Sequence, residues 1–136
     1  MTKVTVKARK RAILLGVLVT AVAIVFSLLP MIASSQRDEV RDVRLVVRDM
    51  SFYVEGSKEP NPTLTFRAGE QVRIVLRNED AGMDHDFSVV AWQAKTKLLE
   101  GRGEDTILIK VPSNKGTESY TCTPHSEMMR GTIRIE

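Results

Sequence analysis

The sequence is poor in residues that form covalent cross-links or multinuclear metal clusters, because its 136 residues include one cysteine and two histidines. A single cysteine excludes an internal disulfide, a four-cysteine zinc ribbon, a two-cysteine dinuclear copper centre and a Cys-x-x-Cys redox motif within one chain. The folded part must therefore be held together by its hydrophobic core or by a bound metal.

Acidic residues are missing from the start of the chain, which makes the overall basic charge misleading. Five of the 20 Lys and Arg residues lie within positions 3–11, before any Asp or Glu. Residues 36–136 then carry 15 basic and 17 acidic groups, a net charge of −2. No basic face is indicated for this part, and we expect no nucleic-acid partner.

Charge is also missing from residues 12–33, a run of 22 residues that are mostly Ala, Val, Ile and Leu. The run is longer than the apolar core of a signal peptide, which has about 7–15 residues. It is long enough to cross a bilayer as a helix, which takes about 20 residues. Small residues at 33–35 could instead form a signal-peptidase site, which would release a soluble secreted form. The positive-inside rule places the following domain outside the cytoplasm in both cases, on the periplasmic or extracellular face.

The rest of the chain lacks helical periodicity and shows short runs typical of β-strands. In the clearest run, Gln71–Asn78, apolar Val72, Ile74 and Leu76 alternate with other residues, which places one face in a core. We expect strands over Val43–Arg48, Phe52–Glu55, Thr63–Arg67, Gln71–Asn78, His85–Val90, Asp105–Val111, Glu118–Cys122 and Thr132–Ile135. They fit an all-β, two-sheet antiparallel sandwich with Greek-key crossings. Residues 91–104 give no clear pattern.

These patterns divide the chain into three parts. We expect an N-terminal membrane anchor or signal helix over residues 1–35, a polar linker over 36–42 and one β-sandwich domain over 43–136. The aromatic residues Phe87, Trp92 and Tyr120 are interpreted as core packing. The charged side chains of the domain, which include Lys95, Lys97 and Arg102, are interpreted as a solvated face.

The only cysteine lies close to a histidine and two adjacent methionines near the end of the chain. Cys122 is expected to end one strand, His125 to lie on the following loop, and Met128 and Met129 to precede the last strand. The second histidine, His85, starts another expected strand. Each residue alone is more often a packing residue than a ligand. Together, a thiolate, two imidazoles and a thioether suit copper, with zinc as the nearest alternative.

The order of these features resembles the cupredoxins, the blue-copper family that includes plastocyanin, amicyanin and azurin. The resemblance is carried by His85-Asp86-Phe87 and by the terminal patterns Tyr-x-Cys-x-Pro-His and Met-x-Gly, and it covers about Val43–Glu136. It implies a cupredoxin-like Greek-key β-sandwich that holds one copper ion. It also implies that Asp86 occupies a position where the family often has asparagine, whose amide can donate a hydrogen bond and a carboxylate cannot.

The resemblance also implies the ligands of the copper ion. His85, Cys122 and His125 are the expected strong ligands, and a methionine is the expected long axial ligand. The azurin spacing His-x-x-x-Met-Lys-Gly-Thr selects Met129, which we take as the axial ligand. The shorter amicyanin spacing His-x-x-Met selects Met128 as the alternative.

We therefore expect a mononuclear type 1 copper protein that carries single electrons between protein partners outside the cytoplasm. An enzyme is not expected, because reductases and oxidases of this family need a second copper domain. The alternative is a protein that captures and delivers Cu(I), since Met83 adds a further thioether beside the expected ligands. An adhesion-type sandwich without a metal is a third interpretation.

Overall fold

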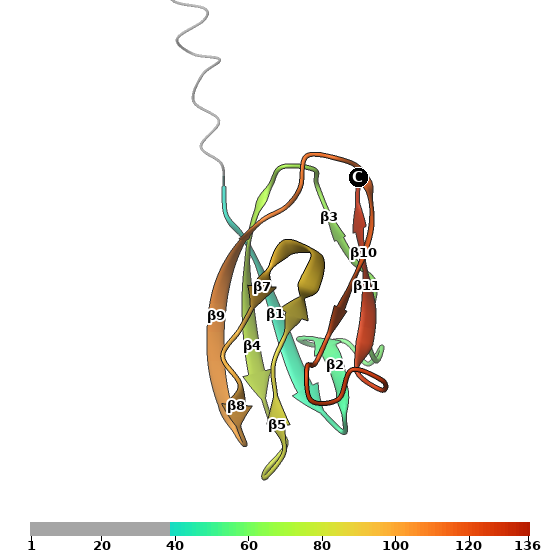
Figure 1. The fold of residues 1–136 in the computed structure, drawn as a ribbon. Coiled ribbons are helices and arrows are strands. Elements are labelled where there is room, and N and C mark those ends of the chain that lie inside the picture. Colours follow the sequence, from blue (N-terminus) through green and yellow to red (C-terminus); the bar gives the residue numbers. More distant parts are fainter. Residues whose placement is uncertain (1–38) are drawn as a thin grey trace, which may run out of the picture. The chain divides into compact units, whose positions relative to one another are not determined.

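The computed structural model describes residues 39–136, which form two main β-sheets and a separate two-stranded sheet around one hydrophobic core (Figure 1). The expected anchor or signal helix over residues 1–35 lies outside the described residues. Among residues 39–136, no helix has the length and apolar character needed to cross a bilayer. The first strand begins at Arg41, two residues before the expected start at Val43.

The first sheet has four strands in the order β2-β1-β4-β9, namely β1 (Arg41–Arg48), β2 (Ser51–Val54), β4 (Gln71–Asn78) and β9 (Gly103–Lys110). The second has five in the order β3-β11-β10-β6-β7, namely β3 (Leu64–Phe66), β6 (Ser88–Val89), β7 (Ala94–Lys95), β10 (Gly116–Thr121) and β11 (Arg130–Ile135). β5 (Asp84–His85) pairs separately with β8 (Leu99–Glu100), and the 3-10 turn η1 (Val90–Trp92) joins β6 to β7.

The all-β sandwich is confirmed, but the expectation of antiparallel pairing throughout is wrong. β1 runs parallel to β4, with Leu45 opposite Leu76, and β3 runs parallel to β11, with Thr65 opposite Arg134. After the β1–β2 hairpin the chain enters the second sheet as β3 and then returns to the first sheet as β4. This excursion brings β4 beside β1 in the same direction, which a direct hairpin could not do.

The alternating strand Gln71–Asn78 has the expected bounds as β4. Val72, Ile74 and Leu76 are fully buried, while Arg73 and Arg77 are exposed. The core also contains a cluster of aromatic rings, in which the Tyr120 ring lies 5.3 Å from both the Phe52 and Phe87 rings. The expected core role of Phe87 and Tyr120 is confirmed, whereas Trp92 is only partly buried at the edge of the core.

The single strand expected over His85–Val90 is instead two short strands with different partners. β5 pairs with β8, whereas β6 pairs with β10 and β7. Between β5 and β6 the chain is held by Thr96, whose hydroxyl accepts a hydrogen bond from the Phe87 N–H at 2.9 Å. The Thr96 N–H in turn donates to the Phe87 carbonyl at 3.0 Å. The break places β5 at the end of the sandwich where the β10–β11 connection also lies (Figure 1).

Candidate metal centre

Cys122 follows β10 directly and continues the ladder between β10 and β11. Within that ladder Tyr120 lies opposite Gly131, and two residues further the Cys122 N–H donates to the Met129 carbonyl at 3.0 Å. The two terminal sequence patterns are therefore one structural feature. Tyr-x-Cys and Met-x-Gly lie on opposite strands, and their pairing fixes Cys122 opposite Met129.

The loop between Cys122 and Met129 is compact because its backbone is hydrogen-bonded internally. The His125 N–H donates to the Cys122 carbonyl at 3.2 Å, and the Met129 N–H donates to the His125 carbonyl at 2.9 Å. The Asn61 side-chain amide reaches across from the β2–β3 connection and donates to the Met128 carbonyl at 3.3 Å. These bonds hold the loop in one conformation.

The two candidate axial methionines differ sharply in exposure. Met129 is fully buried and belongs to the hydrophobic core, whereas 61% of Met128 is exposed. Since the register pairs Met129 with Cys122, the neighbouring Met128 is turned toward solvent. Burial and register therefore both favour Met129 as the thioether available to a metal held by Cys122.

The structure brings together the three strong ligands expected from the sequence. The Cys122 Sγ lies 3.5 Å from the Nδ1 of His85 and 3.7 Å from the Nδ1 of His125. The ligand atoms of the three residues all lie within 4.8 Å of one another. His85 and Cys122 are fully buried, while His125 is partly exposed.

These distances fit one shared metal ion. Bonds from zinc to an imidazole nitrogen measure about 2.0–2.1 Å, and bonds from zinc to a thiolate sulfur measure about 2.3 Å. If the nitrogen–metal–sulfur angle lies between the tetrahedral and the trigonal value, the nitrogen and the sulfur are about 3.6–3.8 Å apart. The observed separations of 3.5 and 3.7 Å are close to this range. Two imidazoles and one thiolate with a thioether nearby are the donor set of an electron-transfer copper site.

Burial sets the protonation of these side chains in the metal-free protein. Burial lowers the pKa of His85 and the nearby His125 lowers it further, while the Asp80 carboxylate acts in the opposite direction. Burial raises the pKa of the Cys122 thiol, although the backbone N–H groups of Asp86 and His125 oppose this effect. The metal-free site therefore contains a thiol, and because metals bind the thiolate, binding releases a proton.

Asp86 provides the hydrogen bond that joins the two ligand-bearing segments. Its Oδ1 accepts a hydrogen bond from the Thr123 N–H at 2.7 Å, and the residue is fully buried between His85 and the Cys122 loop. The bond requires an acceptor at position 86, and a carboxylate accepts as well as an amide carbonyl does. The inability of Asp86 to donate therefore leaves this contact intact.

Lys95 is exposed, as expected, but it also pairs with the buried Asp86, a contact that the interpretation as a solvated face did not include. Its Nζ lies 3.1 Å from the Asp86 Oδ2, which makes no hydrogen bond among the described residues. Lys95 lies on β7, within residues 91–104, a segment without a clear pattern of strand or helix in the sequence. Sequence reasoning also missed Asn61 and Asp80. Both act through contacts between distant loops, for which a single sequence offers no periodic signal.

Comparisons with known proteins agree with this geometry. The family model described as copper binding proteins, plastocyanin/azurin family, matches residues 51–136. Among solved structures, auracyanin A, a "blue" copper protein from the green thermophilic photosynthetic bacterium Chloroflexus aurantiacus, is 17% identical with a TM-score of 0.54. That match covers 72% of this chain and 100% of auracyanin A.

A second auracyanin, from the photosynthetic bacterium Roseiflexus castenholzii, is 16% identical with a TM-score of 0.56, and the match covers 71% of this chain and 97% of that one. At such identities the likeness concerns the fold. A comparison with curated protein sequences finds no match. The family match extends over more than half of the chain and includes His85, Cys122, His125 and Met129. The chain is therefore a member of the plastocyanin/azurin family of copper-binding proteins, a cupredoxin whose cofactor is copper.

Proposed function

We propose that this protein is a mononuclear type 1 copper protein that carries single electrons between protein redox partners and is not an enzyme. His85, Cys122 and His125 are the strong ligands, and Met129 is the axial ligand. The observation that carries the proposal is the convergence of one cysteine sulfur and two imidazole nitrogens at separations of 3.5 and 3.7 Å.

The surroundings of these ligands suit electron transfer. Bound copper supplies a couple between Cu(I) and Cu(II), which prefer different ligands and geometries. A ligand set fixed by the protein lets both states share one geometry, so that little has to move during transfer. Cys122 is fixed by the β10–β11 ladder, and the hydrogen bond from Thr123 to Asp86 ties its loop to the His85 segment.

The exposed side of the site offers a place for a partner to dock. His125 is partly exposed, and the neighbouring Pro124 and Met128 are exposed. An apolar rim around one imidazole permits brief contact with a partner without a large buried interface. We assign His125 as the point where the electron enters or leaves.

We also propose that the domain works outside the cytoplasm, held at the membrane by residues 1–35 or secreted after their cleavage. The support is the uncharged run at residues 12–33 behind a basic cluster. Its partners would then be redox proteins on the periplasmic or extracellular face.

The axial assignment predicts different effects for the two adjacent methionines. Met129→Leu should shift the reduction potential more than Met128→Leu. It removes the buried thioether, which as an axial ligand affects the relative stability of Cu(I) and Cu(II). Protein-film voltammetry of both variants measures this difference. A larger shift for Met128→Leu would contradict the register that pairs Met129 with Cys122.

Delivery of Cu(I) is the second candidate, and exposed thioethers favour it. Met83 is 39% exposed and Met128 is 61% exposed. Such thioethers could pass Cu(I) on by ligand exchange, since Cu(I) prefers soft sulfur ligands. The two candidates differ in whether copper leaves the protein.

We expect repeated reduction and reoxidation with copper retained, and much slower electron exchange in His125→Ala than in Met83→Leu. The physical reason is that His125 is a partly exposed member of the cluster with Cys122 and His85, whereas Met83 is not among the proposed ligands. Stopped-flow electron exchange and metal analysis after cycling measure both quantities. Rapid Cu(I) transfer to an acceptor protein, lost in Met83→Leu while electron exchange is unchanged, would support delivery instead.

A further inference from the structure

The buried ligand His85 has one ring nitrogen that the proposed copper site does not use. Its Nδ1 lies 3.5 Å from the Cys122 Sγ, and when this nitrogen binds the metal, the ring proton of the neutral imidazole lies on Nε2. Nε2 is buried and makes no hydrogen bond among the described residues. The Asp80 Oδ2, which can accept a hydrogen bond, lies 3.3 Å from the His85 Nε2.

Asp80 is held in place by the backbone of the β1–β2 turn and by the Asn78 side chain. Its Oδ1 accepts a hydrogen bond from the Asp49 N–H at 3.0 Å, and its Oδ2 accepts one from the Met50 N–H at 3.4 Å. Its own N–H donates to the Asn78 Oδ1 at 3.0 Å. The carboxylate is therefore fixed before any metal binds, and its Oδ2 stays beside the His85 ring.

The turn that supplies these N–H groups has an unusual backbone. Asp49 and Met50 both have positive φ angles, of 50° and 57°, which suits the tight β1–β2 hairpin but is uncommon for residues other than glycine. In this conformation both N–H groups point to one carboxylate. Asp80 thus links the hairpin turn to the buried ligand.

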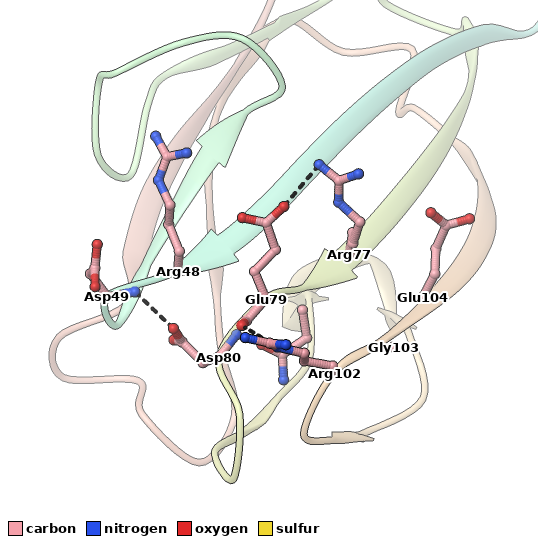
Figure 2. Close-up of a pocket in the computed structure, with 9 residues that line it drawn as sticks. Arg48, Asp49, Arg77, Glu79, Asp80, Arg102, Gly103 and Glu104 are labelled. Carbon is pink, nitrogen blue, oxygen red and sulfur yellow. Dashed lines mark hydrogen bonds and ion pairs between the residues drawn. The ribbon is translucent and has the colours of Figure 1, made fainter.

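Asp80 also forms part of the wall of a surface cavity with a volume of about 800 Å³. Figure 2 shows Asp80 beside Asp49, and the arginines Arg48, Arg77 and Arg102 also line the cavity, with Arg77 paired to Glu79. The side chain of Asp80 is 19% exposed, whereas that of His85 is fully buried. Asp80 is thus a partly solvated negative charge in contact with a buried copper ligand.

We propose that Asp80 is a positioning residue that fixes the His85 ring with Nδ1 toward the metal and lowers the reduction potential of the site. The inference rests on the proposed copper site. A carboxylate beside Nε2 makes the imidazole a stronger donor, and its negative charge favours Cu(II) over Cu(I). Replacing such a partner of a ligating histidine typically costs about 10–100-fold in metal affinity.

The test compares Asp80→Asn with Glu79→Gln in the full-length protein. Both changes remove one negative charge from the same cavity wall, but Glu79 pairs with Arg77 at 3.0 Å and is exposed. Asp80→Asn keeps a side-chain oxygen that can accept from the Asp49 N–H. We expect Asp80→Asn to weaken Cu(II) binding about tenfold or more relative to Cu(I), which raises the potential by about 59 mV for each tenfold change. Glu79→Gln should change it far less.

A second measurement needs neither copper nor a variant. In the metal-free wild-type protein, nitrogen NMR at a pH where the imidazole is neutral should show His85 with its proton on Nε2. A proton on Nδ1, or equal potential shifts in Asp80→Asn and Glu79→Gln, would overturn the inference. If Asp80→Asn does not fold, the position of the His85 ring proton in the wild-type protein is the test of the inference. Failure of the wild-type protein to bind copper would instead contradict the proposed function.

Discussion

Replacement of Cys122 by serine should abolish the intense visible absorption of the Cu(II) protein while the domain stays folded. The absorption arises from charge transfer between the thiolate sulfur and Cu(II), and a serine hydroxyl offers no comparable donor. Serine is close to cysteine in size, so the buried position keeps its packing. Visible absorption after addition of Cu(II) and far-ultraviolet circular dichroism measure the two parts of this prediction.

A suitable control is Thr123→Ser, because the exposed Thr123 side chain is next to Cys122 but only its backbone N–H contacts Asp86. This variant should retain the wild-type spectrum. A Cys122→Ser protein that also kept the wild-type spectrum would rule out a copper–thiolate bond at this position.

Gly131→Ala should destabilise the domain severely, although it adds a single methyl group. A Cβ at position 131 would overlap the Cζ and Oη atoms of Tyr120, which lies opposite on β10. Tyr120 cannot withdraw, because its ring packs between Phe52 and Phe87 and its hydroxyl donates to the Pro62 carbonyl at 2.6 Å. Overpacking of this kind reaches about 3 kcal/mol or more in the free energy of unfolding.

Gly116→Ala is the matched control, because Gly116 lies on the partner strand β10 and a Cβ there would meet no atom within 4 Å. Its effect on the free energy of unfolding should stay within about 1 kcal/mol. Urea denaturation of both variants measures the difference. Equal losses would show that the packing of Tyr120 on Gly131 does not stabilise the β10–β11 ladder.

The terminal motif shows why part of the site could be predicted from sequence alone. Cys122, His125 and Met129 are close in sequence, and the pairing of Tyr120 with Gly131 fixes their relative positions. Local spacing was enough to select Cys122 and His125, but it left both Met128 and Met129 open as the axial ligand, and the burial of Met129 favours that residue. His85 was selected by elimination, since the chain has only two histidines, and the structure places it beside Cys122 and fully buried.

The residues that support the ligands could not be predicted in this way. Asp80, Asp86 and Lys95 act through contacts that join separate loops and strands, and such contacts depend on the tertiary fold. The same limit explains the strands. β4 was predicted with its bounds because its alternation is local, whereas the break between β5 and β6 results from a change of pairing partner.

Titration of the purified wild-type protein with Cu(II), followed by visible absorption, is the decisive test of the copper–thiolate site. An intense charge-transfer band should grow until one copper is bound per chain and should disappear reversibly on reduction, with the copper retained. A protein that binds no copper, or binds Cu(II) without such a band, would contradict a site in which Cys122 is joined by His85 and His125.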